Sequence, residues 1–339
     1  MFEHYDAAWN ELTAEGAPFA VTQIEVRGHP CRVFSAAPPT MRALWELAQG
    51  NGDKTYVIYE DERYSYAEIG ARVRSLAHYL RDVHGVGSGD RVAIAMRNYP
   101  EWVVAYWAIA SIGAAAVGMN AWWTSHEMQY GLSDSTPKVL IADDERIERV
   151  LPVLDDLRAG APLHLVSVRS DRELPDGADR WADVVQPDEA PEGLPDADID
   201  PDDDVTIFYT SGTTGFPKGA QLTHRGSVHN VMNIAFMNAC TAAAEAKAIE
   251  AGDIPAPDGE AGPEPPPPIL LAPTPLFHVT ANNCLLQPTT LAGGTITFMY
   301  KWDAARALEL IEREHVTTFS GVPTMSREML LHPDWATRD

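Results

Sequence analysis

Between residues 56 and 142, the hydrophobic pattern switches repeatedly between the two-residue period of a strand and the 3.6-residue period of a helix. Apolar runs typical of buried strands lie at 91–96, 114–119 and 138–142. Helical patterns lie between them, at about 100–113 and 124–132. Strands that alternate with helices form a parallel sheet covered by helices on both faces. The pattern therefore predicts an α/β fold.

A similar series continues in the second half of the chain. Strand patterns lie at 205–209, 269–272, 294–299 and 316–319, and helical patterns lie at 223–239 and 303–314. Before the first series, 56–59 and the region of Tyr64 indicate a hairpin, and Ser65 with Glu68 forms a capping box for the next helix. Thr124 and Glu127 form another.

Acidic residues divide the chain into regions. The net charge is −24 over 339 residues, and residues 171–204 alone hold 14 acidic residues and 2 arginines. We interpret 171–204 as an acidic connector between a first α/β unit at 1–170, which includes an N-terminal extension, and a second at 205–339. Residues 241–268 contain too few apolar side chains to offset the cost of ordering, so we expect a disordered-like insert there.

The composition also excludes several classes of partner. An acidic surplus repels a phosphate backbone, so nucleic acid is not expected as a partner. No apolar run is long enough to cross a bilayer, and the first residues show no signal-peptide pattern, so we expect no integral membrane segment. Cys31, Cys240 and Cys284 are far apart in sequence, which indicates reduced thiols and a cytoplasmic protein.

The segment most informative about function is YTSGTTGFPKG at 209–219, where a buried strand leads into a loop rich in glycine and hydroxyl groups. Backbone N–H groups in such a loop can face phosphate oxygens, and Lys218 adds a positive charge. It is not a Walker loop, because Pro217 precedes the lysine and Gly219 follows it. A flexible turn from strand to helix is the alternative. The candidate phosphate-binding residues are Thr210, Ser211, Gly212, Thr213, Thr214, Gly215 and Lys218.

This motif closely resembles the phosphate-binding signature of adenylate-forming enzymes, the group that includes acyl-CoA synthetases, nonribosomal adenylation domains and luciferases. The resemblance extends in the same order along the chain, through 64–120, 122–143, TPLFHV at 274–279 and FSGVPTM at 319–325. It implies the N-terminal domain of such an enzyme, with two packed parallel-type sheets flanked by helices and a small β region.

The resemblance also implies an acid–thiol ligase reaction that uses ATP, Mg²⁺ and CoA. A fatty or related carboxylic acid attacks the α-phosphate of ATP to give acyl-AMP, and the CoA thiol then takes the acyl group. The loop from Thr210 to Lys218 would hold the β- and γ-phosphates, with the Thr210 hydroxyl near Mg²⁺. Fixed donors at the leaving pyrophosphate suit this chemistry.

Two further segments would line the pocket for the acid and the adenine. By resemblance, His278 lies at the boundary between the acyl pocket and the nucleotide, and a wall role fits it better than proton transfer. Asn282 replaces a tryptophan that gates the tunnel in several long-chain synthetases, so aryl and medium-chain acids stay open. The turn formed by Gly321, Val322, Pro323 and Thr324 would contact the acyl group and the adenine, or simply begin a helix.

Other conspicuous residues have simpler interpretations. Trp122 and Trp123 are expected to be packing residues. His224 and His229 are five residues apart on a predicted helix, which places them on different sides, so no zinc site is expected there.

The last expectation concerns the extent of the domain. The sequence ends at Asp339 before the YGxTE segment, the ribose-binding aspartate and the small C-terminal catalytic domain of the family. We therefore expect this part alone to be inactive. A noncatalytic protein that binds nucleotide or acyl groups, and an adenylating enzyme with another acceptor, are the alternatives, and a homodimer stays open.

Overall fold

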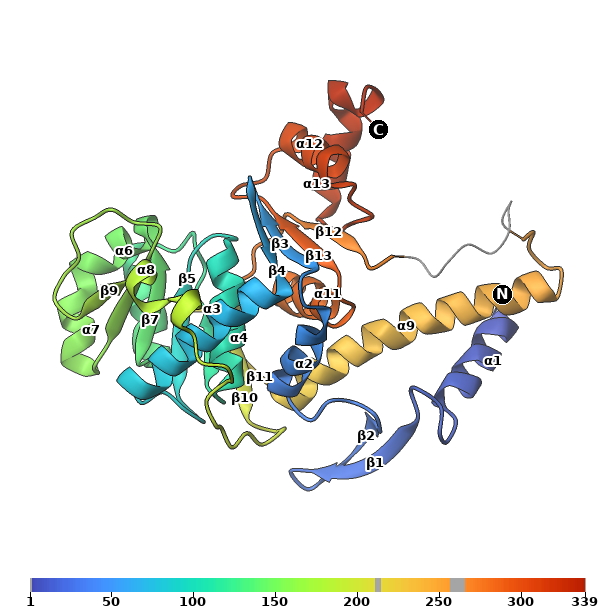
Figure 1. Cartoon of the computed structure of the whole chain (residues 1–339), viewed down its shortest axis with the longest axis horizontal. Coiled ribbons are helices and arrows are strands. Elements are labelled where there is room, and N and C mark those ends of the chain that lie inside the picture. The colour runs from blue at the N-terminus through green and yellow to red at the C-terminus, as the bar shows by residue number, and fades with distance from the viewer. Residues whose placement is uncertain (1, 211–214, 257–265, 339) are drawn as a thin grey trace.

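The computed structural model describes residues 2–210, 215–256 and 266–338 (Figure 1). The expectations for Ser211, Gly212, Thr213 and Thr214, and those for 257–265, lie outside the described residues. The described chain contains two mixed sheets with helices packed on them, together with a separate hairpin, and the expected α/β class is confirmed.

The first sheet has seven strands in the order β11-β10-β6-β5-β7-β8-β9, all parallel to their neighbours except β11, which is antiparallel to β10. Its strands are β5 (Arg91–Ala95), β6 (Ala115–Gly118), β7 (Val139–Asp143), β8 (His164–Val168), β9 (Ala178–Arg180), β10 (Asp204–Thr210) and β11 (Lys218–Thr223). One face packs on α3 (Tyr66–His78) and α4 (Pro100–Ser111). The other packs on α5 (Ser125–Ser135), α6 (Asp144–Val150) and α7 (Leu154–Gly160).

The second sheet has five strands in the order β14-β12-β13-β3-β4. They are β3 (Thr55–Tyr59), β4 (Glu62–Ser65), β12 (Ile269–Ala272), β13 (Thr295–Phe298) and β14 (Thr318–Phe319), and only β3 and β4 pair antiparallel. The helices that follow its strands are α10 (Val279–Ala281), α11 (Gln287–Leu291), α12 (Ala304–Glu314) and α13 (Pro323–Leu331).

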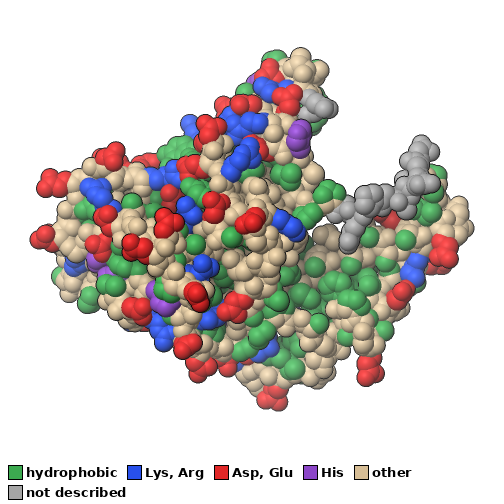
Figure 2. All heavy atoms as spheres, viewed as in Figure 1, with side chains coloured by type: hydrophobic (Ala, Val, Ile, Leu, Met, Phe, Trp, Pro, Cys, Tyr) green, Lys and Arg blue, Asp and Glu red, His purple; other side chains and the backbone are tan. Residues whose placement is uncertain are grey.

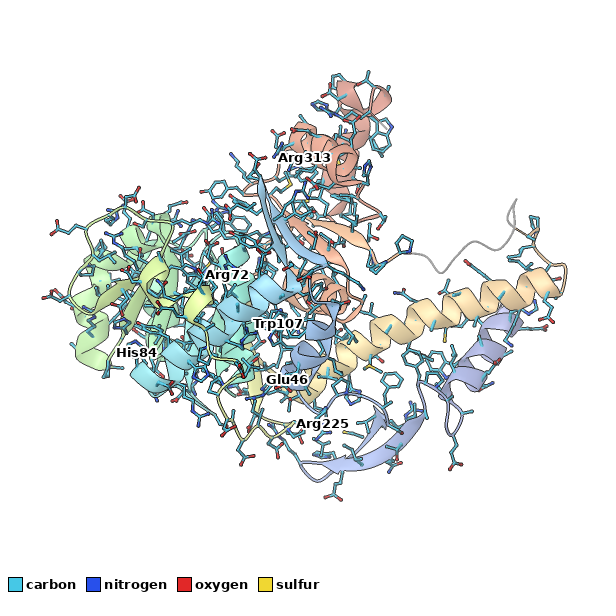
Figure 3. All side chains as sticks on the ribbon, in the orientation of Figure 1. Glu46, Arg72, His84, Trp107, Arg225 and Arg313 are labelled. Atoms are coloured by element: carbon cyan, nitrogen blue, oxygen red, sulfur yellow. The ribbon has the colours of Figure 1, made fainter. Side chains whose placement is uncertain are left out.

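Helix α4 joins the two sheets into one core. Its side chains are almost all buried, because it packs on the first sheet and against β3 of the second. Trp107 of α4 donates from Nε1 to the Tyr56 hydroxyl of β3 over 3.0 Å, and its ring stacks on Trp45 of α2 (Met41–Ala48) with the centroids 5.1 Å apart (Figure 3). These three aromatic side chains are buried where α2, α4 and β3 meet, so the two sheets share one hydrophobic core.

The sheets do not follow the division of the chain expected at the acidic connector. Strands β3 and β4 lie before residue 170 but join the second sheet. Strands β10 and β11 begin at the end of the connector or after it but join the first sheet, where β10 pairs with β6. The connector itself contributes β9 and α8 (Trp181–Val184). Pairing between strands distant in sequence depends on packing that a local pattern does not record.

Helix α9 (His224–Glu250) is longer than the pattern predicted. The predicted helix ended at 239, and 241–250 was assigned to the insert, whereas the helix continues through the alanine-rich segment TAAAEAKAIE. Alanine, glutamate and lysine have high helix propensity, and α1 (Phe2–Thr13) packs along this part of α9 (Figure 1). The expectation of an insert beginning at 241 is therefore wrong for residues 241–250.

The hairpin of β1 (Val21–Val26) and β2 (His29–Phe34) lies beside α1 and α9. These elements line a hollow of about 590 Å³ that includes Trp9, Phe34 and Phe236. Figure 2 shows hydrophobic side chains on this side of the molecule and acidic side chains over much of the rest of the face. In the described part of the chain, no helix has both the length and the apolar composition that a bilayer span requires.

Candidate active site

A cleft of about 360 Å³ lies where the carboxyl ends of strands from both sheets meet. Open α/β sheets place ligands at this edge, beyond the carboxyl ends of their strands. The first sheet contributes Arg97 and Asn98 after β5 and Trp122 after β6. The second sheet contributes Pro273, Pro275 and Phe277 after β12, Met299, Tyr300, Lys301 and Trp302 after β13, and Met325 after β14.

Asn98 fixes the segment that follows β12 against the end of β5. Its side chain is buried, donates to the Thr274 carbonyl over 2.9 Å and accepts from the Leu276 N–H over 2.9 Å. Two bonds to the backbone satisfy an amide that would be costly to bury unpaired. The TPLFH segment is thereby held at the cleft.

The predicted phosphate loop joins β10 to β11, not a strand to a helix. Thr210, the last residue of β10, is paired in register with Lys218, the first residue of β11, and both are exposed. The Thr210 hydroxyl donates to the Lys218 carbonyl over 3.4 Å. The structure thus brings these two candidate residues together, whereas a strand-to-helix turn would have separated them.

The described end of this loop is anchored to α5. Tyr130 donates to the Pro217 carbonyl over 3.0 Å, and its ring stacks on Phe216 with the centroids 4.7 Å apart. Gly215 has a φ of +116°, a conformation that glycine adopts at no steric cost. These features fix the direction in which the chain re-enters the sheet at Lys218.

A glycine in β6 lets β10 and the TPLFH segment approach each other. A Cβ atom at Gly118, the last residue of β6, would lie 2.8 Å from the Phe208 ring of β10 and 3.4 Å from the Phe277 Cα. Phe277 in turn contacts Trp122 edge to face, with the centroids 5.2 Å apart. The ends of β6 and β10 and the residue before His278 therefore lie at one place.

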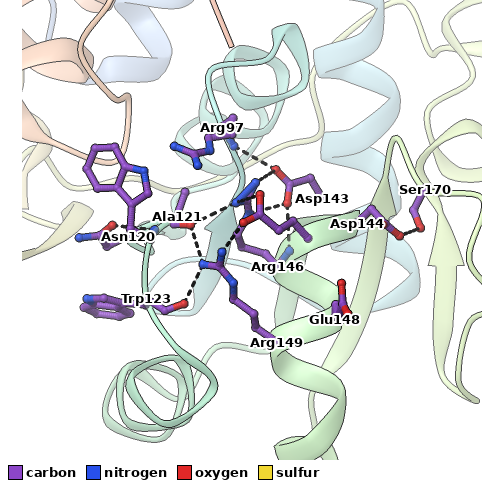
Figure 4. A network of polar contacts seen from close by, with 12 residues as sticks. Arg97, Asn120, Ala121, Trp123, Asp143, Asp144, Arg146, Glu148, Arg149 and Ser170 are labelled. Carbon is purple, nitrogen blue, oxygen red and sulfur yellow. Dashed lines mark hydrogen bonds and ion pairs between the residues drawn. The ribbon is translucent and has the colours of Figure 1, made fainter. Parts of the chain in front are cut away.

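One wall of the cleft is held by a buried charged network (Figure 4). Asp143, at the end of β7, accepts from the Arg97 backbone N–H over 3.1 Å and from the Arg146 guanidinium over 2.6 and 2.7 Å. Both side chains of this ion pair are almost completely buried, with exposed fractions of 1% for Arg146 and 4% for Asp143. The two parallel hydrogen bonds of a bidentate arginine–carboxylate pair fix the orientation of both side chains.

The same network fixes the loop that carries Trp122. Arg146 donates to the Ala121 carbonyl over 3.1 Å, and Arg149 donates to the carbonyls of Ala121 and Trp123 over 2.9 Å each. The Arg97 guanidinium lies 5.5 Å from the ring centroids of Trp122 and of Tyr300, so a cation lies between aromatic faces across the cleft.

His278 and Asn282 lie in different environments. His278 precedes the short helix α10, its ring is partly exposed, and the packing around it lowers the pKa of the imidazole below its ordinary value. Asn282 is fully buried and accepts from Trp102 Nε1 over 3.3 Å. The side chain expected on the pocket wall therefore faces the core.

The turn at 321–324 begins a helix, as one of its two interpretations predicted. Val322 precedes α13, and Pro323 is its first residue. Gly321 is needed for close packing, because a Cβ there would lie 2.7 Å from the Phe319 ring. Within residues 321–325, Met325 is the residue that lines the cleft.

Sequence reasoning missed Arg97, and it assigned Trp122 to packing. Trp122 has an exposed fraction of 52% and lines the cleft, while Trp123 is buried as expected. The signal that identifies both missed residues is position, since each lies a few residues beyond the carboxyl end of a predicted parallel strand.

Comparisons with known proteins agree with this arrangement. The AMP-binding enzyme family matches residues 44–339. The chain is 33% identical over 285 residues to a feruloyl-CoA synthase of an Amycolatopsis species, covering 84% of this chain and 49% of that protein. It is 30% identical over 282 residues to 4-coumarate–CoA ligase 3 of Oryza sativa subsp. japonica, covering 82% and 45%.

Solved structures show the same fold. The N-terminal domain of FACL13 from Mycobacterium tuberculosis has a TM-score of 0.65 and 27% identity, with 88% of this chain and 67% of that chain covered. The chain spans about half the length of the curated relatives it matches. With the family match over most of its residues, the chain belongs to the AMP-binding enzyme family.

Proposed function

We propose that this chain provides the ATP- and acid-binding part of an AMP-forming acid–CoA ligase. The observation that carries the proposal is that Thr210 and Lys218 of the YTSGTTGFPKG motif pair at the carboxyl end of β10, and the carboxyl ends of strands from both sheets also form the cleft. A carboxylate attacks the α-phosphate of ATP, the bond to pyrophosphate breaks, and acyl-AMP forms. The CoA thiol then attacks the acyl carbon and releases AMP.

The phosphate-binding role falls to Thr210, Lys218 and the loop residues Ser211, Gly212, Thr213, Thr214 and Gly215. Thr210 offers a hydroxyl and Lys218 a cation at the same end of the β10–β11 ladder, and a hydroxyl next to a lysine fits Mg²⁺ and phosphate oxygens. Bound Mg²⁺ would neutralise charge that develops on the leaving pyrophosphate. The chain's own groups position the phosphates before the reaction.

The acid enters the cleft between the sheets. Trp122, Phe277, Tyr300 and Trp302 give it apolar and aromatic walls, which suits a fatty or related carboxylic acid, including an aromatic one. His278 follows Phe277 of the cleft lining and is proposed as a wall residue, and burial lowers the pKa of its imidazole. The start of α13 forms part of the proposed pocket through Gly321, Val322, Pro323 and Thr324. Asn282 does not line the pocket and accepts a hydrogen bond from Trp102 in the core.

We propose that the complete ligase reaction requires a protein of about the length of the matched relatives. The matched relatives are about twice as long as this chain, so we expect the 339 residues alone to bind ATP without releasing product. CoA is the proposed acceptor because the curated relatives are named as CoA ligases or synthases. We place the enzyme in the cytoplasm.

Lys218→Ala and Thr210→Ala test the site. In the full-length gene product, each should lower carboxylate-dependent pyrophosphate release by at least about tenfold, because each removes a donor aimed at phosphate. Lys247→Ala is the matched control, since Lys247 lies on α9 and pairs with Glu11 at 2.7 Å. The assay uses a panel of short, medium, long and aromatic acids, with and without CoA.

Unchanged rates in both variants would refute the assignment of the loop. Binding of Mg²⁺–ATP without pyrophosphate release for any acid would instead support the alternative, a noncatalytic nucleotide-binding protein.

A further inference from the structure

Three polar side chains from distant parts of the chain meet at the edge of the first sheet, away from the cleft. His84 follows the π-helical turn that extends α3, His164 is the first residue of β8, and Asp179 is the middle residue of β9 (Figure 3 labels His84). His164 lies at the amino end of its strand, whereas the cleft lies at the carboxyl ends. The two places are therefore distinct.

The donor atoms of these side chains converge. One ligand atom from each residue lies within 4.8 Å of the other two, and His164 Nε2 is 3.0 Å from Asp179 Oδ2. The two imidazole rings have centroids 4.2 Å apart. A metal held at about 2.1 Å by tetrahedral ligands keeps the ligand atoms about 3.4 Å apart, so small side-chain rotations bring the set to metal-binding geometry.

Tyr79 occupies the centre of the cluster. Its hydroxyl donates to Asp179 Oδ2 over 2.5 Å, and it lies 2.9 Å from His84 Nε2 and 3.1 Å from His164 Nε2. Burial and the Asp179 carboxylate raise the pKa of the phenol, so it stays protonated and is a poor ligand. The hydroxyl marks the point on which the three donor groups are aimed.

We propose that His84 Nε2, His164 Nε2 and Asp179 Oδ2 bind a Zn²⁺ ion. Two imidazoles and one carboxylate are a common ligand set for zinc, whereas Mg²⁺ prefers oxygen ligands throughout. On binding, each ring takes the tautomer with its proton on Nδ1 and turns its Nε2 lone pair to the metal, and Tyr79 rotates aside while it still donates to Asp179. The side chains are half-buried, which limits competition from water without closing the site.

The fourth position faces solvent. His84 and His164 line a cleft of about 700 Å³ together with Thr136, Lys138, Arg158 and Gly177. Water or a small anion can complete the tetrahedron from this side. The Arg158 guanidinium is turned away, because it donates to the carbonyls of Leu163, Asp176 and Gly177.

A bound metal would link three elements that otherwise meet at a sheet edge. It would connect the end of α3 to β8 and to β9, the short strand within the acidic connector. Binding only to the folded state stabilises it by mass action. The site thus predicts a metal-dependent rise in the unfolding temperature, independent of ATP.

The experiment uses the 339-residue chain, free of purification tags and treated with chelator. Zn²⁺ alone is titrated in equilibrium dialysis, and Co²⁺ replaces it for visible spectroscopy, in which a tetrahedral site absorbs strongly. We expect one metal per chain and a raised unfolding temperature. His84→Ala and Asp179→Asn should each weaken binding by at least about tenfold.

Asp179→Asn keeps the acceptor for Tyr79, so it removes the ligand charge with little change to the fold. Two further variants separate metal binding from effects on the fold. Tyr79→Phe should bind as tightly as the unaltered chain or more tightly, because it removes the hydroxyl that competes for the donors. His126→Ala, an exposed histidine of α5, is the control and should bind normally.

Failure of the unaltered chain to bind Zn²⁺, or equal binding by the His84, Asp179 and His126 variants, would overturn the proposal. Loss of binding in Tyr79→Phe would also overturn it, because the hydroxyl would then be a ligand. None of these outcomes depends on ligase activity.

Discussion

A single buried histidine links α9 to the start of α2. His224, the first residue of α9, is completely buried, and its Nδ1 accepts from the Met41 N–H over 3.1 Å. Burial lowers the pKa of its imidazole from 6.5 to about 4. The folded protein therefore holds this ring neutral at pH values where the unfolded chain protonates it.

This difference predicts that the protein loses stability as the pH falls from about 6.5 to about 4. The unfolded state takes up a proton that the folded state does not, so the free energy of unfolding falls by about 2 kcal/mol between pH 7 and pH 5 from this residue. In His224→Asn, the amide oxygen can accept the Met41 N–H but cannot titrate. Urea unfolding at the two pH values should show a smaller loss in the variant.

The same loss in both proteins would show that other groups cause the pH dependence. His126→Asn is the control, because it makes the same substitution at an exposed position of α5.

At the scale of elements, local signals were sufficient where the chain itself supplies the partner. Both predicted capping boxes are present, with the Ser65 side chain accepting from the Glu68 N–H and the Thr124 side chain accepting from the Glu127 N–H. Such motifs involve neighbours three residues apart and survive any tertiary arrangement. The helices that they begin were therefore predicted correctly.

Several elements that depend on their pairing or packing partners were not predicted. Strand β11 exists because Lys218–Thr223 pairs with β10, and α1 is stable because α9 passes beside it. The sequence pattern did not predict the extension of α9 to Glu250, because alanine has a small apolar side chain and gives a weak hydrophobic period. Ala244 and Ala248 are nevertheless completely buried.

The packing of α1 on α9 gives a matched pair of variants. Ala248→Asp should expose α1 to solvent, because it places a charge at a buried position in the part of α9 along which α1 packs (Figure 1). Ala246→Asp, at an exposed position two residues away, carries the same change in helix propensity without the burial. Hydrogen exchange measured by mass spectrometry should rise for residues 3–13 only in the first variant.

Similar exchange in both variants would mean that packing of Ala248 does not hold α1 in place.

At the scale of the whole molecule, the two sheets are interleaved in sequence. An early hairpin completes the second sheet, and a late one extends the first. Alternating periodicity predicted most strands of the two sheets and their parallel class, although it missed β8, β9 and β11. It contains no information on which distant strand becomes the neighbour. The candidate phosphate motif is a local pattern that the sequence alone contains, whereas the positions of Arg97 and Trp122 at the cleft depend on how the strands are arranged.

Interleaving predicts that the chain does not separate at the acidic connector. Residues 1–170 and 205–339, expressed separately, should each lack a cooperative thermal transition, because each would leave a sheet without strands that its core requires. Circular dichroism melts of the two fragments and of the intact chain check this. A cooperative melt of either fragment alone would contradict it.

The buried pair of Asp143 and Arg146 has a consequence for selectivity. Since it fixes the Arg97 backbone and the loop before Trp122, a ligand in the cleft meets that wall already in its final shape, and no entropy is lost in ordering it. On the opposite side, Met325 is half-buried and most residues of α13 are exposed. For the proposed acid substrate, we therefore expect the α13 side to adapt to differences in chain length, while the wall formed by Arg97 and Trp122 keeps its position.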